Sequence, residues 1–204
     1  MARGTITSVA TGSRRIIVAI TGASGAIYGV RLLEHLRELD VETHLIATRW
    51  ARITIEHETG RSFADVRALA DVTYAEGDQG AAVSSGSFVT DGMIIAPCSM
   101  KTIAALATGF SHNLVARAAD VVLKERRMLV LCVRETPLHS VHLRNLLTLS
   151  DMGAVIAPPV PAFYTQPKEL ADVVDQTVVR LLDQFGIHED VPTRWQGLPP
   201  GDDD

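Results

Sequence analysis

Short apolar runs alternate with longer stretches of helical periodicity along most of the chain. Residues 16–20 are apolar throughout, which is typical of a strand that is buried on both faces. Residues 26–39 place Ile, Val and Leu at spacings of three and four, which predicts an amphipathic helix. The same criteria predict strands at 41–48, 93–96 (stopped by Pro97), 128–133 and 154–157, and helices at 50–57, 63–70, 100–107, 114–126 and 139–150.

A last helix is predicted from Pro167, a favourable first-turn residue, to Phe185, where Gly186 ends it. Apolar strands that alternate with helices predict a parallel sheet covered on both sides. The expected fold class is therefore α/β, a Rossmann-like or flavodoxin-like parallel sheet with helices on both faces in a single domain. We expect a flexible N-terminal extension at 1–14, the domain at 15–188 and a C-terminal tail at 189–204.

Charge and composition exclude several classes of function. The net charge is −5 and no basic stripe stands out, so a nucleic-acid partner has no electrostatic support. No apolar run reaches the roughly 18–20 residues that cross a bilayer, and residues 1–14 lack the apolar core of a secretory signal. We therefore expect a cytoplasmic protein without a membrane partner. Cys98 and Cys132 are the only cysteines, and their apolar surroundings predict buried free thiols.

The segment TGASGA, residues 21–26, joins the first predicted strand to the first predicted helix. Gly22 and Gly25 permit a tight turn, Ser24 adds a hydroxyl, and the helix N-terminus directs free N–H groups at an anion. The spacing is G-x-x-G and not the dinucleotide fingerprint G-x-G-x-x-G. The loop is either a simple turn or a site for the phosphate of a mononucleotide.

A second loop, PCSMKT at 97–102, follows another predicted strand at the edge where doubly wound sheets bind ligands. Ser99 and Thr102 are suited to cap the next helix, a structural role that is compatible with ligand binding. Lys101 places a cation at a helix N-terminus, which is unfavourable unless an anion joins it. The loop therefore favours an anionic ligand.

Several cationic and hydroxyl side chains are candidates for binding a second phosphate. Arg117 and Lys124 are seven residues apart on one predicted helix face, and Arg134 with Glu135 directly follows the strand at 128–133. Each alone is compatible with a surface charge or a structural ion pair, but a charged pair after a buried strand needs a partner such as phosphate. The seven histidines form no H-E-x-x-H motif and no D-D-x-x-D element occurs, so no metal site is predicted.

Together these motifs resemble the bacterial UbiX/Pad1-type flavin prenyltransferases. The likeness covers about residues 15–195 and is carried by TGASGAIYGVRLLEHLR, SSGSF, PCSMKT, ARAADVVLKERRMLVLCVRETPLHSVHLRN and MGAVIAPPVPAFYTQP. The resemblance implies an enzyme of the ubiquinone-pathway type that joins the dimethylallyl group of dimethylallyl monophosphate to N5 and C6 of reduced FMN. It also implies a homododecamer with active sites at subunit interfaces, and a UbiD-type decarboxylase that receives the prenylated FMN.

The resemblance further implies roles for individual residues. FMN would be bound by Gly22, Ala23, Ser24, Thr48, Ser99, Met100, Lys101, Thr102 and Arg134. The phosphate of the prenyl donor would meet Ser24, Arg117, Lys124, Arg134, Tyr164 and Arg180. Ser24, Glu58, Glu135 and Tyr164 would be catalytic. Gln79 stands where some relatives have a tryptophan beside the prenyl pocket.

Two other functions remain as alternatives. Flavin-dependent cysteine decarboxylases share the expected fold, but they typically carry a P-A-S-A-N-T-like loop where this chain has PCSMKT. A non-catalytic accessory subunit that carries FMN for a hydroxyarylic acid decarboxylase would need the same binding residues. The presence of both Glu58 and Glu135 favours an enzyme.

Overall fold

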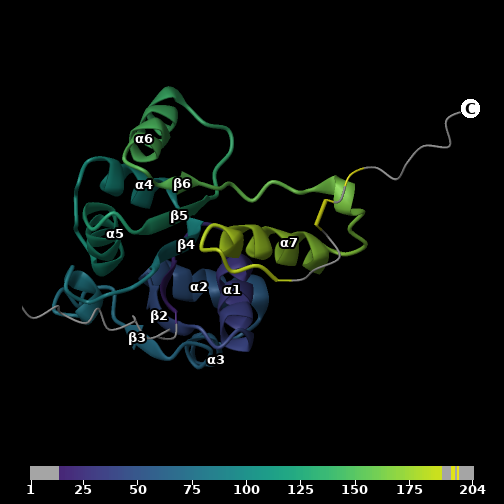
Figure 1. Cartoon of the computed structure of the whole chain (residues 1–204), viewed down its shortest axis with the longest axis horizontal. Coiled ribbons are helices and arrows are strands. Elements are labelled where there is room, and N and C mark those ends of the chain that lie inside the picture. The colour runs from purple at the N-terminus through teal and green to yellow at the C-terminus, as the bar shows by residue number, and fades with distance from the viewer. Residues whose placement is uncertain (1–13, 190–193, 196, 198–204) are drawn as a thin grey trace, which may run out of the picture.

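The computed structural model describes residues 14–189, 194, 195 and 197 of the chain (Figure 1). The described residues form one six-stranded sheet in the order β3-β2-β1-β4-β5-β6, with every neighbouring pair parallel. This is the doubly wound order in which ligands bind where the strand order reverses, between β1 and β4. The strands are β1 (Arg15–Ile20), β2 (Glu42–Ala47), β3 (Val72–Tyr74), β4 (Gly92–Cys98), β5 (Met128–Val133) and β6 (Val155–Ile156).

Helices cover both faces of the sheet, which confirms the expected fold class (Figure 1). One face packs against α1 (Ala26–Glu38), α2 (Arg49–Thr59), α3 (Phe63–Arg67) and α7 (Leu170–Asp183). The other packs against α4 (Met100–Ala107), α5 (Leu114–Lys124) and α6 (Ser140–Asp151). The alternation of side chains along β1 divides the core, because Ile16 and Val18 join the first layer while Ile17 and Ala19 join the second. Two single-turn helices, η1 (Ala82–Ser84) and η2 (Phe163–Thr165), lie in loops.

Several element boundaries differ from the sequence prediction, and one strand was not predicted. Pro97 does not end its strand but lies inside β4, at a shift of register against β5 between Ile95 and Cys98, where the missing N–H is tolerated. Helix α7 begins at Leu170 and not at Pro167, since a capping box at Glu169 and Asp172 fixes its first turn. Strand β3 was not predicted. The extension at 1–14 and the tail at 189–204 lie almost wholly outside the described residues.

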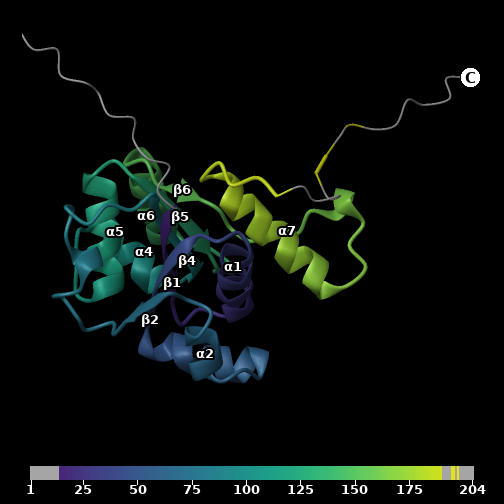
Figure 2. The same ribbon diagram turned by 60° about the horizontal axis from the view of Figure 1, so that its bottom comes forward.

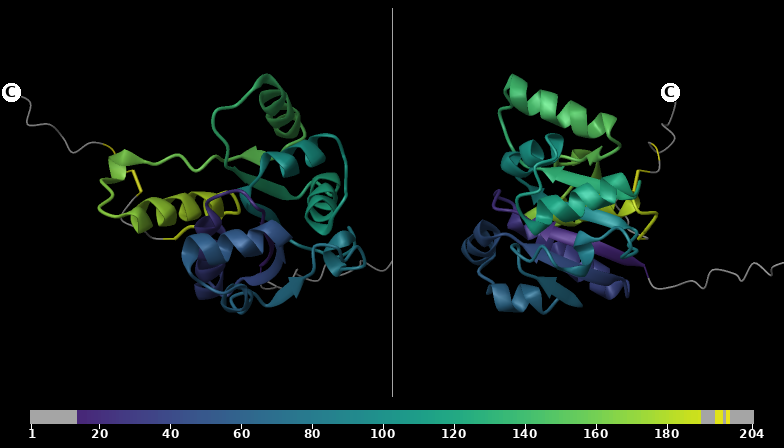
Figure 3. Two further views of the ribbon diagram at one scale, coloured as in Figure 1. Left: turned by 180° about the vertical axis from the view of Figure 1, so that it is seen from behind. Right: turned by 90° about the vertical axis from the view of Figure 1, so that its left-hand side faces the viewer.

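Between β6 and α7 the chain leaves the sheet and runs outward beside α7, and we call residues 158–169 the arm. Figure 2 shows the arm and the first turns of α7 projecting from the domain, and the view from behind in Figure 3 agrees. Large apolar side chains on this projection face outward: Val160 is 68% exposed, and Phe163 and Leu170 are each 76% exposed. A surface of this kind is typical of a contact with another protein chain.

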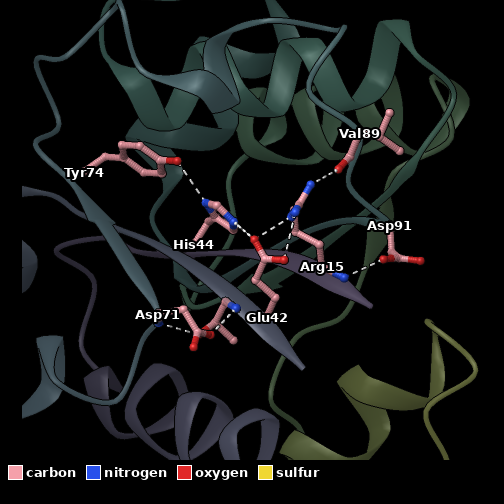
Figure 4. A network of polar contacts seen from close by, with 8 residues as sticks. Arg15, Glu42, His44, Asp71, Tyr74, Val89 and Asp91 are labelled. Atoms are coloured by element: carbon pink, nitrogen blue, oxygen red, sulfur yellow. Dashed lines mark hydrogen bonds and ion pairs between the residues drawn. The ribbon is translucent and has the colours of Figure 1, made fainter. Parts of the chain in front are cut away.

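A network of polar contacts joins the first three strands along one edge of the sheet (Figure 4). The Arg15 guanidinium donates to both carboxylate oxygens of Glu42, at 2.7 and 2.8 Å. His44 lies between this carboxylate and the Tyr74 hydroxyl, at 2.8 and 2.9 Å. The hydrogen bonds from Arg15 outweigh partial burial and hold the pKa of Glu42 below its usual range. The network therefore joins β1, β2 and β3 through their side chains.

Cys98 and Cys132 are both buried free thiols, which confirms the prediction from their apolar surroundings. Burial raises the pKa of both groups, to about 12 for Cys132. No helix among the described residues is long and apolar enough to span a membrane.

Candidate functional site

A cavity of about 360 Å³ lies at the carboxyl ends of β1, β2 and β4, beside the point where the strand order reverses. It combines the ends of two predicted ligand loops, which come together from segments about 75 residues apart in the chain. Its walls are formed by Thr21, Gly22, Thr48, Arg49, Trp50, Glu76, Ser99, Lys101, Thr102, His112 and Asn113. We call it the switch-point pocket.

Two helices begin at this pocket, and a hydroxyl residue that lines it caps each of them. Thr48 caps α2, since its Oγ1 accepts from the Ala51 N–H at 3.1 Å. Ser99 caps α4, since its Oγ accepts from the Thr102 N–H at 3.4 Å. Each cap uses only one of the free N–H groups in a first helical turn, so both helices still present positive N-termini to the pocket. Such an arrangement is suited to a phosphate.

Two cations reinforce this positive end of the pocket. Arg49 is the first residue of α2 and Lys101 is the second residue of α4. Both are exposed and both line the pocket. Within the described part of the chain, neither side chain forms an ion pair. Among the described residues, the positive charges at these two helix N-termini therefore lack an acidic partner.

The floor of the pocket depends on a close contact between Gly22 and Trp50. A Cβ placed on Gly22 would lie only 2.4 Å from the Cβ of Trp50. Glycine is therefore required at this position for steric reasons. Trp50 remains 67% exposed and adds an aromatic surface to the pocket wall. The sequence analysis assigned no role to Trp50.

The loop from β1 to α1 is occupied by a carboxylate of the protein itself. Glu58 of α2 accepts hydrogen bonds from the N–H groups of Gly25 at 2.8 Å and Ala26 at 2.9 Å. Partial burial raises the pKa of Glu58, but hydrogen bonds from Ala26, Ser24 and Gly25 and the charge of Arg134 outweigh burial and lower the pKa below its ordinary value. Glu58 is thus a carboxylate at neutral pH, held at the start of α1.

The loop after β5 approaches the same region. The backbone N–H of Arg134 donates to the carbonyl of Cys98 at 3.1 Å, which places Arg134 beside the start of the α4 loop. Its guanidinium is close enough to Glu58 to affect the pKa of that carboxylate. Glu135 is exposed, and its Oε1 accepts from the Thr136 N–H at 3.0 Å. Ser24, Glu58 and Arg134 are thus brought together from three separate elements.

The other predicted cations lie elsewhere in the chain. Arg117 donates to the Ser84 carbonyl at 3.2 Å and pairs with Asp120 at 2.9 Å. Lys124 pairs with Glu125, and its ammonium lies against Gly86. Both residues of α5 therefore contact the loop after η1, the SSGS segment. This loop leads into the start of β4. It therefore lies at the amino ends of the strands, opposite the carboxyl ends of β1 and β4 that form the switch-point pocket.

Tyr164 and Arg180 line a second cavity, of about 390 Å³, between the arm and α7. Tyr164 is half-exposed and its ring meets Trp195 edge to face, with centroids 5.5 Å apart. Arg180 pairs with Asp183 at 2.6 Å. Tyr164 and Arg180 therefore form a third group of predicted site residues, separate from the switch-point pocket and from the α5 residues.

One chain does not bring Lys124 and Arg134 together. Lys124 ends α5 four residues before β5 begins, whereas Arg134 directly follows the last residue of β5. Six residues of strand span about 16 Å at roughly 3.3 Å per residue. The Lys124 ammonium points to Gly86 at the far edge, not along the strand. A site that uses both residues needs more than one chain.

Sequence reasoning missed five residues that line the switch-point pocket: Arg49, Trp50, Glu76, His112 and Asn113. Asn113 has a local signal, since it caps α5 by accepting from the Ala116 N–H at 3.0 Å. His112 and Glu76 have none, because the loops that carry them reach the pocket only through the fold. The backbone N–H of Leu114 donates to the Glu76 carbonyl at 2.7 Å and joins these two loops.

A doubly wound parallel sheet with a phosphate-type pocket at its switch point is the architecture of a nucleotide-binding protein. The family model Flavoprotein matches residues 5–182, and the chain belongs to that family. Within it, the chain is 58% identical over 187 residues to flavin prenyltransferase UbiX of Escherichia coli strain K12, covering 90% of this chain and 99% of the relative. The resemblance to UbiX-type flavin prenyltransferases is thereby confirmed.

Two solved structures share the fold over nearly their whole length. The crystal structure of AnUbiX (PadA1) in complex with FMN and dimethylallyl pyrophosphate has a TM-score of 0.89 and 52% identity, covering 92% of this chain and 100% of that one. A dodecameric FMN-dependent UbiX-like decarboxylase from Escherichia coli O157:H7 has a TM-score of 0.88 and 55% identity, with coverage of 90% and 100%.

Proposed function

We propose that this protein is a flavin prenyltransferase that transfers a dimethylallyl group from dimethylallyl monophosphate to N5 and C6 of reduced FMN. The observation that carries the proposal is the switch-point pocket, where the N-termini of α2 and α4 and the cations Arg49 and Lys101 meet. Membership of a family of flavin prenyltransferases supports the same reaction.

The residues of the pocket fit the phosphate end of FMN. Thr48, Ser99 and Thr102 offer hydroxyls, and the first turns of α2 and α4 offer N–H groups to a dianion. The lack of a side chain at Gly22 avoids a steric clash with Trp50 at the floor of the pocket. Ala23, Ser24 and Met100 belong to the same two loops, and Arg134 is next to them. When bound, reduced FMN supplies the nucleophilic nitrogen and carbon that receive the prenyl group.

The protein's own contribution is charge and proton placement. An allylic phosphate departs when donors meet the negative charge that develops on it, and Arg117, Lys124, Arg134, Tyr164 and Arg180 are donors of this kind. Glu58 is ionised, so it acts as a base that accepts a proton during transfer. Glu135, exposed beside Arg134, is the second acid–base group and relays a proton between the departing phosphate and the ring-closure step.

These donors belong to three separate groups in one chain, and we place the complete site between subunits. The arm, with Tyr164, projects from the domain and exposes Val160, Phe163 and Leu170. Helix α6 buries only Leu149 and exposes Val141, Leu143 and Leu147. Both surfaces suit contacts with other copies of the chain, and a homododecamer like the E. coli relative accommodates them. Delivery of the product to a UbiD-type decarboxylase, the ubiquinone pathway and a cytoplasmic location stay predictions.

Anaerobic mixing of the purified protein with reduced FMN and dimethylallyl monophosphate tests the proposal. We expect a flavin product whose mass has increased by one dimethylallyl group and whose absorption spectrum differs from that of FMN. Bound FMN without such a product would favour a non-catalytic accessory subunit. Release of CO₂ from a peptidyl-cysteine, without prenyl transfer, would favour a cysteine decarboxylase. Dimethylallyl diphosphate should be tested as an alternative donor in the same assay, because an AnUbiX structure contains it.

A further inference from the structure

His112 lines the switch-point pocket but belongs to none of the motifs that indicate FMN binding. It lies in the connection between α4 and α5, one residue before the Asn113 cap. Its ring stacks on Phe110, with centroids 5.4 Å apart and planes inclined by 14°. The stacking contact on Phe110 places the exposed ring of His112 at the pocket wall.

A hydrogen bond fixes which nitrogen of His112 carries a proton. Nδ1 lies 3.3 Å from the backbone carbonyl of Phe110. A carbonyl oxygen can only accept a hydrogen bond, so Nδ1 donates and holds the hydrogen of the neutral ring. Nε2 of neutral His112 is consequently an acceptor. It becomes a donor when the ring takes up a second proton, or when the neutral ring gives up the Phe110 hydrogen bond and moves its hydrogen to Nε2.

This tautomer matters because a phosphate oxygen accepts hydrogen bonds and cannot donate to Nε2 once it is ionised. Among the residues that line the pocket, three other side chains carry charge: Arg49 from α2, Lys101 from α4 and Glu76 after β3. Arg49 and Lys101 each carry a positive charge, and Glu76 carries a negative charge. A phosphate dianion adds two negative charges and reverses the balance.

We propose that His112 is a phosphate-positioning residue that takes up a proton when the phosphate of FMN enters the switch-point pocket, so that FMN affinity depends on pH. The inference rests on the proposed FMN site, and it goes beyond the proposed reaction because it concerns the binding step. Protonated Nε2–H donates to a phosphate oxygen, which is a charge-assisted hydrogen bond. Histidine is suited to this role because it exchanges its proton between pH 5 and 8.

Isothermal titration of the full-length protein with FMN, in two buffers of different ionisation enthalpy at pH 7.5, measures protons taken up on binding. We expect FMN binding to the wild-type protein to be accompanied by the uptake of about one more proton than binding to His112→Gln. The glutamine keeps a hydrogen-bonding side chain but cannot titrate. Between pH 6.5 and 8, wild-type affinity for FMN should fall about tenfold more than that of His112→Gln. The matched control His57→Gln removes an exposed imidazole from the opposite end of α2 and should behave as wild type.

Two further ligands identify the group that His112 senses. Inorganic phosphate should reproduce the proton uptake, and riboflavin, which lacks the phosphate, should bind without it. Tight FMN binding with the same proton uptake in wild type and His112→Gln would overturn the inference and leave the proposed function intact. Equal uptake with riboflavin and FMN would also overturn it. Absence of FMN binding to the wild-type protein would instead contradict the proposed function.

Discussion

The carboxylate of Glu58 lies 2.8 Å from the backbone nitrogen of Gly25, although 33 residues separate them in the chain. Glu58, near the end of α2, thereby accepts hydrogen bonds from the free N–H groups at the start of α1 and places a negative charge at that helix N-terminus. Neighbouring donors hold this carboxylate ionised beside Arg134. The position links the loop that was predicted to bind phosphate with a candidate catalytic base.

Replacing Glu58 by Gln should therefore slow prenyl transfer by roughly 10²- to 10⁴-fold, because the base is lost while the amide oxygen still accepts from Gly25. Single-turnover formation of prenylated FMN measures the rate. The pKa of Glu58 is lowered, so its contribution as a base persists through neutral pH and is lost only as the pH falls below the ordinary glutamate range. Glu56→Gln, on the same helix and exposed, is the control. A wild-type rate in Glu58→Gln would remove Glu58 from the mechanism.

The contact of Gly22 with Trp50 predicts a steric coupling between the two positions. Gly22→Ala should destabilise the protein by about 1–3 kcal/mol and weaken FMN binding, since the new methyl group would meet the Trp50 side chain. In a Trp50→Gly background, which removes the Cβ that the new methyl group would meet, the same substitution should cost much less. Urea unfolding and FMN titration of the four proteins form a double-mutant cycle. Additive effects would show that the two residues do not meet as described.

The separation of Lys124 from Arg134 predicts complementation between inactive chains. Lys124→Ala and Arg134→Ala should each be inactive alone, but subunits dissociated, mixed in equal amounts and reassembled should regain activity. If each site takes one residue from each of two chains, about a quarter of the sites in a random mixture are intact. Prenylated FMN formation before and after mixing provides the measurement. Failure to regain activity, in oligomers shown to be mixed, would mean that one chain supplies both residues.

Asp183 predicts a pH-dependent contribution to stability. Burial raises the pKa of Asp183, but hydrogen bonds from Arg194, His188 and Arg180 outweigh burial and lower the pKa from 3.8 to about 2. Because the pKa is lower in the folded than in the unfolded chain, the stabilisation is complete above about pH 4 and disappears as the pH falls through 2. Its size is about 2 kcal/mol. Asp183→Asn should lower the free energy of unfolding by this amount at pH 7.

The difference between Asp183→Asn and wild type should become smaller at pH 3, as measured by urea unfolding at both pH values. Asp151→Asn is the control, because Asp151 is exposed at the end of α6. A loss that is the same at pH 7 and pH 3 would indicate altered packing and not the loss of the ionised carboxylate.

Local physics explains which parts of the structure the sequence revealed. The apolar runs of β1 and β5 and the Ser99 cap carry their signals within a few residues, so the sheet and the start of α4 could be predicted. Strand β3 could not, because its three residues are only half-buried at the sheet edge. Its partner, β2, is distant in sequence.

The site was less predictable than the fold. Glu58 has no local motif, since its donors at Gly25 and Ala26 come from another helix, and only family resemblance indicated it. His112 reaches the pocket through a loop whose direction depends on α4 and α5. The separation of Lys124 from Arg134 depends on which edge of the sheet each terminus of β5 reaches, which the helical spacing of Arg117 and Lys124 does not reveal.

The burial of Cys98 and Cys132 has a consequence for work in air. Free reduced flavin reacts with oxygen and releases hydrogen peroxide, which oxidises thiolates to sulfenic acid. Both sulfurs are enclosed in the core and held as thiols by their raised pKa values. The protein should therefore keep its cysteines unmodified while it handles a substrate that generates an oxidant.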